Sequence, residues 1–167
     1  MITMCRRALI ASLASAFACF AQVASAQTTK DLVGTWLLVS VTVDRAGMKS
    51  APFGQNPKGV LMFDAGGRVS MVIARADLPN VTGNTRAAGS SKEIRAIVRG
   101  SLAYFGTYSV SPAERAFVVH VEGGTFPNWV GTDQKRIFTV VGDELKYTDG
   151  ERSGGAGTSL VVWQRAK

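Results

Sequence analysis

The amino-acid sequence predicts an all-β domain, and three observations carry this prediction. Short runs of apolar or alternating residues recur along the chain. Eight such runs follow one another at the close spacing that is typical of a β-barrel or a β-sandwich. Turn-forming residues separate the runs, as at Gly66 and Gly67, either of which can adopt a positive φ in a hairpin. The expected strands span residues 32–43, 58–64, 67–75, 103–110, 116–122, 134–141, 143–148 and 158–165.

One segment has a helical pattern instead. Ser90 and Glu93 form the pattern of a capping box, in which the serine caps the helix and the glutamate reaches back to it. Apolar residues follow at helical spacing as far as Val98. The sequence therefore predicts one short amphipathic helix that ends near Gly100. We expect this helix to close one mouth of a barrel rather than to pack on its outer wall.

The first 26 residues have the pattern of an export signal. Arg6 and Arg7 form a short cationic region, residues 8–21 form an apolar run, and Ala24-Ser25-Ala26 matches a cleavage site. The apolar run is short for a bilayer span, although an uncleaved N-terminal anchor is the alternative. We therefore predict a signal peptide over residues 1–26, one domain over residues 27–167, and a periplasmic or secreted location.

Removal of this segment changes the chemistry available to the protein. Both cysteines, Cys5 and Cys19, lie within it, so the mature chain would have no disulfide, thiol nucleophile or thiolate metal site. The formal net charge falls from +7 to +5 with the loss of two arginines. The remaining basic residues are spread along the chain. They do not form the basic stripe with interleaved aromatic residues that is typical of a nucleic-acid-binding protein. We expect no nucleic-acid partner and no stable membrane insertion after cleavage.

A Gly-x-Trp motif, Gly34-Thr35-Trp36, opens the first expected strand. It resembles the lipocalin signature, in which the tryptophan packs across the barrel floor and an arginine from a late strand covers its indole ring. Arg165 is the candidate arginine, and a cation–π contact of this kind contributes roughly 0.5–2 kcal/mol. The resemblance implies structural roles for Trp36 and Arg165.

Further motifs follow in order through most of residues 27–167. They are residues 32–40 (LVGTWLLVS), 52–59 (PFGQNPKG), 64–70 (DAGGRVS), 103–108 (AYFGTY), 120–123 (HVEG), 126–131 (FPNWVG), Arg136 and residues 142–145 (GDEL). Together they resemble the bacterial lipocalin-like domain family of small secreted or cytosolic barrels. The resemblance implies an eight-stranded antiparallel barrel around a cavity, and it implies no settled activity.

Polar residues with useful chemistry lie on three consecutive expected strands. Tyr104 and Tyr108 share one strand face, His120 and Glu122 share another, and Arg136 lies on the third strand. We expect these five side chains to point inward as one wall that suits a carboxylate, phenol or enol. The alternative places them in solvent with the intervening valines inside, because a one-residue shift in register reverses every side chain.

Two neighbouring residues complete the candidate site. The missing side chain at Gly106 leaves room for a ring or a ligand, and Trp129 either stacks on the ligand or packs at the barrel rim. One histidine and one nearby glutamate do not make a three-ligand zinc site, and no phosphate loop or dinucleotide fingerprint is present. We expect no metal and no cofactor.

Three functions remain open. The leading hypothesis is an exported carrier that holds a small apolar or amphipathic molecule in the barrel. The second is a cofactor-free isomerase or cyclase that uses His120 or Glu122 as its acid or base. The third is a structural or stress-related envelope protein, against which a cavity of roughly 300 Å³ or more would argue. The ligand and the oligomeric state are not specified by the sequence.

Overall fold

A computed structural model describes residues 27–83, 85, 87–149 and 157–167. The predicted signal peptide, residues 1–26, lies outside the described residues. In chain order the elements are α1 (Thr29–Leu32), β1 (Gly34–Arg45), β2 (Met48–Ser50), β3 (Lys58–Phe63), β4 (Arg68–Ala74), α2 (Ser91–Gly100), β5 (Ser101–Ser111), β6 (Ala116–Gly124), the 3-10 helix η1 (Pro127–Trp129), β7 (Asp133–Val141), β8 (Glu144–Asp149) and β9 (Thr158–Arg165).

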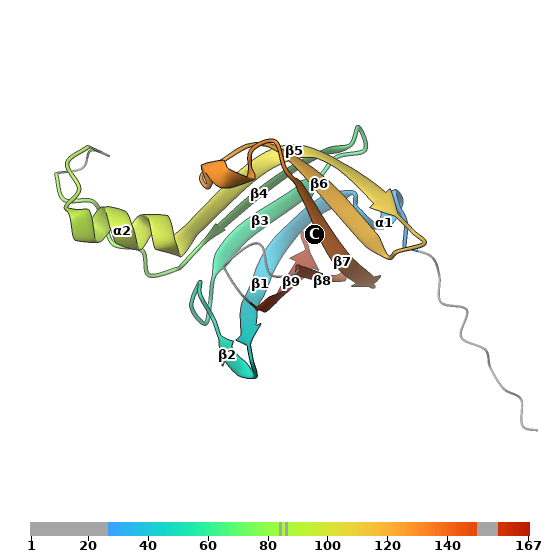
Figure 1. The fold of residues 1–167 in the computed structure, drawn as a ribbon, viewed down its shortest axis with the longest axis horizontal. Coiled ribbons are helices and arrows are strands. Elements are labelled where there is room, and N and C mark those ends of the chain that lie inside the picture. Colours follow the sequence, from blue (N-terminus) through green and yellow to red (C-terminus); the bar gives the residue numbers. More distant parts are fainter. Residues whose placement is uncertain (1–26, 84, 86, 150–156) are drawn as a thin grey trace, which may run out of the picture.

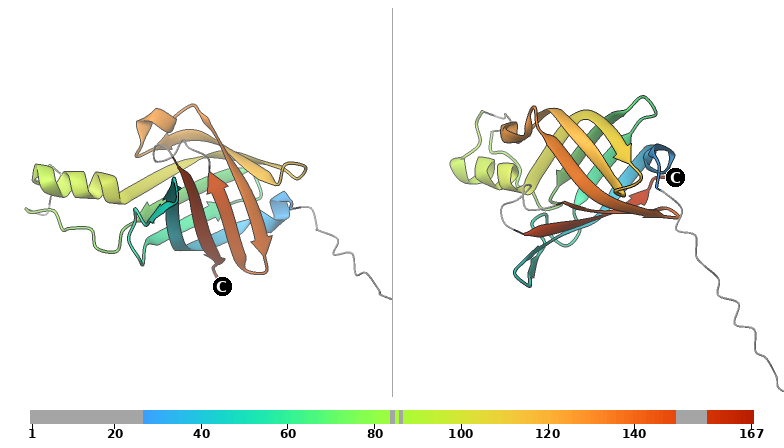
Figure 2. Two further views of the ribbon diagram at one scale, coloured as in Figure 1. Left: turned by 60° about the horizontal axis from the view of Figure 1, so that its bottom comes forward. Right: turned by 45° about the vertical axis from the view of Figure 1, so that its right-hand side comes forward.

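The strands form one antiparallel sheet that closes on itself. Consecutive strands pair from β3 to β9, and β1 pairs with both β3 and β9 (Figures 1 and 2). Closure removes the free sheet edges that would otherwise invite association with other chains. The expected eight-stranded barrel is confirmed. Each predicted strand is present, with its ends displaced by two residues or fewer.

The short strand β2 and the single-turn helix α1 were not expected. β2 pairs only with the end of β1, where Arg45 lies opposite Met48. α1 precedes β1 and carries the fully buried Leu32 into the barrel. The two elements mark opposite ends of the barrel, because β1 runs from α1 at one end to the β1–β2 hairpin at the other (Figure 1). We call these the closed end and the mouth end.

The predicted helix is present as α2, with the expected capping box. Ser90 Oγ accepts a hydrogen bond from the backbone N–H of Glu93, and the Glu93 carboxylate accepts from the backbone N–H of Ser90. Thr82 Oγ1 also donates to this carboxylate at 2.6 Å. Hydrogen bonds from Thr82 and Ser90 lower the pKa of Glu93 to about 2. The carboxylate therefore ties the preceding loop to the start of the helix at neutral pH.

The expected position of α2 across the barrel mouth is wrong. Figures 1 and 2 show α2 projecting away from the barrel at the mouth end. The physical reason is its connection to β5, which starts at Ser101 with an extended φ of −140° directly after the last helical residue. No linker turns the chain back over the opening, so only the last turn of α2, at Arg99, reaches the rim. Among the described residues, no helix is long and apolar enough to cross a bilayer.

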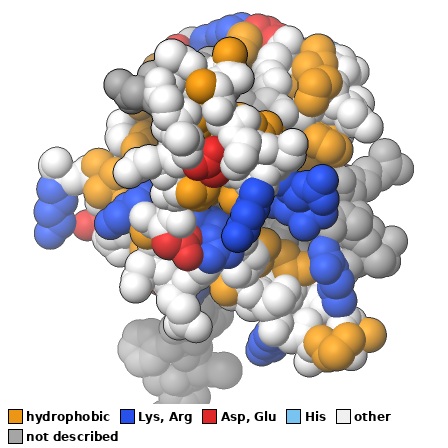
Figure 3. Space-filling model, turned by 90° about the vertical axis from the view of Figure 1, so that its left-hand side faces the viewer, with side chains coloured by type: hydrophobic (Ala, Val, Ile, Leu, Met, Phe, Trp, Pro, Cys, Tyr) orange, Lys and Arg blue, Asp and Glu red, His pale blue; other side chains and the backbone are white. Residues whose placement is uncertain are grey.

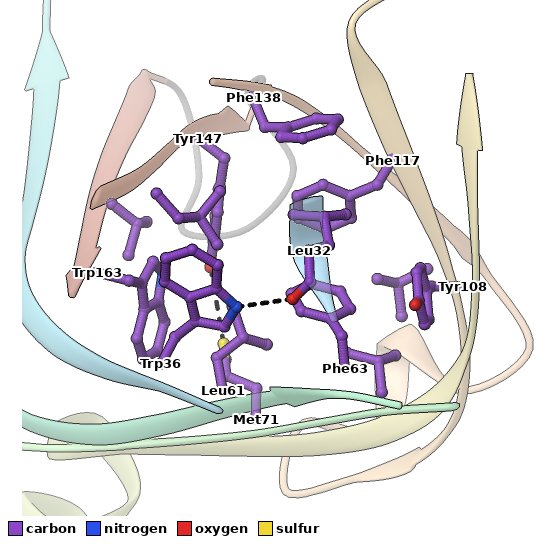
Figure 4. Close-up of a cluster of buried hydrophobic side chains, with 14 of the residues drawn as sticks. Leu32, Trp36, Leu61, Phe63, Met71, Tyr108, Phe117, Phe138, Tyr147 and Trp163 are labelled. Carbon is purple, nitrogen blue, oxygen red and sulfur yellow. Dashed lines mark hydrogen bonds between the residues drawn. The ribbon is translucent and has the colours of Figure 1, made fainter. Parts of the chain in front are cut away.

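The closed half of the barrel is filled with side chains. Phe117 makes edge-to-face contacts with Phe63, Phe138 and Tyr147 at ring-centre distances of 5.4–5.5 Å (Figure 4). Such pairs add about 0.5–1.5 kcal/mol each beyond the area that they bury. The space for a ligand must therefore lie toward the mouth end.

Candidate functional site

A cavity of about 240 Å³ occupies the mouth half of the barrel. Val41, Val161 and Met71 contribute its apolar wall, together with Tyr104 and Tyr147. All five side chains are buried. The volume exceeds the roughly 150 Å³ that holds benzene in an engineered apolar cavity. It is smaller than the roughly 300 Å³ at which drug-sized pockets begin. The cavity therefore has room for one substituted ring.

A buried ion pair forms the polar part of the cavity wall. Arg136 and Asp149 lie directly opposite each other on β7 and β8, and their side chains are 4% and 7% exposed. Arg136 Nε is 3.5 Å from Asp149 Oδ2. The guanidinium also lies 6.0 Å from the centre of the Tyr147 ring. The charges of this buried pair compensate each other, and two further cavity-lining arginines, Arg45 and Arg99, lie exposed at the opening.

Two tyrosines lie beside this pair. Burial raises the pKa of Tyr104 and of Tyr147, although the positive charge of Arg136 opposes the rise in both. Both phenols therefore remain protonated at neutral pH. The hydroxyl of Tyr147 donates to Met71 Sδ at 3.7 Å. The polar cluster can offer a ligand hydrogen-bond donors from Arg136 and Tyr104 and an acceptor from Asp149.

Three of the predicted ligand residues line the cavity. These are Tyr104, Trp129 and Arg136. Trp129 is 5% exposed, and its ring makes an edge-to-face contact with Tyr104 at 5.9 Å. The short helix η1 holds Trp129 in this position at the mouth end of the barrel.

The expected single wall of polar side chains is wrong for His120 and Glu122. Both point to the outer surface, where His120 Nδ1 lies 2.8 Å from Asp133 Oδ1. Glu122 forms a two-point ion pair with Arg68, which lowers the pKa of the glutamate. Neither residue lines the cavity. In the part of the chain that the structure describes, neither side chain is therefore placed to act as an acid or base on a molecule in this cavity.

The register between β5 and β6 explains this result. Directly paired residues of antiparallel strands have side chains on the same face. Tyr108 is paired with Val119, and His120 is paired with Thr107. Because Tyr108 and Val119 point inward, His120 must point outward. The sequence analysis expected His120 and the tyrosines on the same face of the sheet. The observed register differs from that expectation by one residue.

Tyr108 and Gly106 also differ from the expectation. Tyr108 points inward at the closed end, where its ring contacts Phe63 and its hydroxyl donates to the carbonyl of Asp64 at 2.8 Å. It does not line the cavity. The space beside Gly106 is filled by β6, because an added Cβ would lie 1.9 Å from the carbonyl oxygen of His120. This glycine permits close strand approach at a bulge rather than making room for a ligand.

Sequence reasoning missed Asp149 and Tyr147. Leu145, Tyr147 and Asp149 alternate along β8 and all point inward. The expected strand ended at residue 148, so the inward position of Asp149 was not considered. Extending the alternation by one residue would have indicated a carboxylate inside the barrel.

The two predicted structural residues meet at the closed end. Arg165 Cζ lies 4.0 Å from the ring centre of Trp36, which is fully buried. Trp36 Nε1 donates to the carbonyl of Leu32 at 2.8 Å (Figure 4). Arg165 donates to the carbonyls of Asp31 and Val33 at 2.8 and 2.9 Å. These hydrogen bonds from Trp36 and Arg165 hold α1 in place across the closed end.

The model of the lipocalin-like domain family matches residues 33–166, nearly the whole described barrel. The chain belongs to the lipocalin-like family. It is also similar to the 4'-hydroxy-3'-methoxypropiophenone carrier protein ppsC of Aspergillus oryzae. The two are 27% identical over 106 residues, which cover 58% of this chain and 96% of the relative. This similarity and the lipocalin-like barrel support small-molecule binding in general.

Proposed function

We propose that the protein is an exported carrier of small amphipathic molecules with a single aromatic ring. The observation that carries the proposal is the cavity of about 240 Å³, whose buried part combines a mainly apolar wall with one charge-compensated polar cluster. Ligand sites commonly combine apolar walls with a few polar groups that fix the orientation. An aromatic ring would fill the space between Val41, Val161 and Trp129, and its polar substituent would meet Arg136 and Tyr104.

The chemistry of the cluster favours an uncharged ligand. In the buried part of the cavity Asp149 already balances the charge of Arg136, so a ligand carboxylate placed against this pair would add an uncompensated buried charge, whereas Arg45 and Arg99 lie at the exposed opening. A ketone or a phenol can accept from Arg136 or Tyr104 without adding charge. The name of the relative in Aspergillus oryzae denotes a carrier for a phenolic ketone with one ring. This class of compound agrees with the volume and polarity of the cavity here.

Binding can be tested with 4'-hydroxy-3'-methoxypropiophenone itself as the trial ligand. Isothermal titration calorimetry should detect binding to residues 27–167. Val161→Phe should raise Kd by about tenfold or more, because it places a ring inside the cavity. Unchanged affinity in this variant would contradict a site inside the barrel.

Val72→Phe is the matched control for this experiment. Val72 lies on the outer face of β4 and is 51% exposed, so the same substitution adds its ring to the solvent side. It should leave Kd unchanged. The carboxylate analogue, 4-hydroxy-3-methoxybenzoate, should bind about tenfold more weakly than the ketone at neutral pH. Equal affinity for the two compounds would contradict the preference for uncharged ligands.

Export is the second part of the proposal, and the N-terminal pattern supports it. Cleavage after Ala26 would release a chain that begins at Gln27 and contains every strand of the barrel. N-terminal sequencing of the protein isolated from its native source should therefore start at Gln27. A chain that retains residues 1–26 would contradict export by a cleaved signal.

A further inference from the structure

Exposed cations and apolar side chains gather at the mouth end of the barrel. The β1–β2 hairpin contributes Arg45, Met48 and Lys49, and α2 contributes Lys92, Arg95, Val98 and Arg99. We call this set the mouth face. Figure 3 looks onto this end and shows Lys and Arg side chains interspersed with hydrophobic ones. Arg45 and Arg99 also line the cavity, so the face surrounds its opening.

The two kinds of side chain lie on adjoining faces of α2. Lys92, Arg95 and Arg99 follow one another at intervals of three and four residues, which places them on one face. Ile94 and Val98 share the adjoining face, where they are 38% and 67% exposed. A helix with a basic face and an apolar face is suited to lie in the interface of an anionic membrane.

Met48 is an exposed apolar side chain on the β1–β2 hairpin. It is 74% exposed, and Lys49 is its neighbour in β2. The hairpin and the helix therefore present the same combination of an apolar side chain next to cations. Isolated apolar side chains of this kind can enter the acyl boundary while lysine and arginine reach the headgroups.

Several cations of the mouth face are not paired with acids among the described residues. On the barrel wall, by contrast, some basic side chains form salt bridges, as in Arg68–Glu122 at 2.7 Å and Lys135–Glu114 at 2.6 Å. Lys49, Lys92 and Arg95 form no salt bridge within the described part of the chain. Their charge is thus available for phosphate groups of anionic lipids.

We propose that the mouth face docks the barrel onto the surface of an anionic phospholipid bilayer. In this orientation the cavity opens toward the headgroup region, where small amphipathic molecules concentrate. The contact is a surface attachment through the hairpin and α2, and the barrel itself stays outside the bilayer. The inference is independent of cavity binding, because neither Lys92 nor Val98 lines the cavity.

Vesicle co-sedimentation of ligand-free residues 27–167 tests this proposal. The protein should sediment with phosphatidylcholine vesicles that contain phosphatidylglycerol, and not with pure phosphatidylcholine vesicles. Binding should weaken as salt is added, because surface charges are screened. The variant K49E/K92E/R95E should lose about tenfold or more in vesicle affinity, since each lysine or arginine near an anionic surface adds to the attraction.

The variant K30E/K135E/K146E is the control, because it reverses three charges at positions outside the mouth face. It should bind vesicles nearly as well as the unmodified protein does. Val98→Asp should also weaken binding, because it replaces an exposed apolar contact with a negative charge that anionic lipids repel. Equal losses in the two triple variants, or equal binding to both vesicle types, would overturn the proposal. A dimer in solution that Val98→Asp dissociates would overturn it too, because a second copy would then cover this face.

Discussion

Replacing Arg136 with methionine should lower the free energy of unfolding by about 3–5 kcal/mol. Arg136 and Asp149 are both nearly inaccessible to solvent inside the barrel. The single substitution would remove the Arg136 charge that lies against the buried Asp149 carboxylate. Removing one partner of a buried ion pair is costly for this reason, whereas removing both partners together often is not. Urea unfolding monitored by tryptophan fluorescence would measure the change.

Two further variants make this prediction specific. R136M/D149L should regain most of the stability that R136M loses, because it removes both members of the buried pair together. Lys135→Met is the control on the same strand, where Lys135 is exposed and pairs with Glu114 on the outer surface. It should change stability little. A loss in R136M no larger than that in Lys135→Met would show that the buried pair does not hold the cavity wall together.

Trp36→Ala should destabilise the protein by about 3–5 kcal/mol, as is usual when a buried aromatic ring is truncated. The ring is fully buried between the closed-end core and the Arg165 guanidinium. Its loss would leave a void and also remove the hydrogen bond to Leu32 that holds α1 across the barrel floor. Thermal or urea unfolding would report the loss.

Val39→Ala is the control for this substitution, because Val39 lies on the outer face of the same strand and is 50% exposed. It should change stability by about 0.5 kcal/mol or less. A double-mutant cycle with Arg165→Met should give a coupling of about 0.5–2 kcal/mol for the stacked pair. A coupling near zero would mean that the guanidinium contributes only through its bonds to the Asp31 and Val33 carbonyls.

The positions of the strands were predictable because they depend on local patterns. Gly67 adopts a φ of +85° between β3 and β4, as the Gly-Gly pair indicated. Ser90 and Glu93 marked the start of α2 correctly through a capping box that involves only neighbouring residues. The short strand β2 was missed, since its three exposed residues have no alternation of buried and exposed positions.

The candidate site was only partly predictable. Arg136 and Tyr104 were placed correctly on inward faces, whereas His120 was not. A strand sequence shows which residues share a face, and it does not show which face is inside when both carry plausible side chains. Val119 and Val121 are fully buried, and they pair with inward-facing residues of β5 and β7. Packing inside the barrel therefore placed the apolar face of β6 on the inside.

The sequence by itself determined the all-β architecture, the helix boundary and the family motifs, because turn chemistry, capping and strand alternation act over a few residues. Tertiary structure decided the register that turned His120 outward and paired Arg136 with Asp149 inside the barrel. It also decided that α2 projects from the rim beside the cavity mouth rather than closing it. These features depend on the register between neighbouring strands, on packing inside the closed barrel and on the direction in which α2 continues into β5, none of which is visible in the pattern of a single strand.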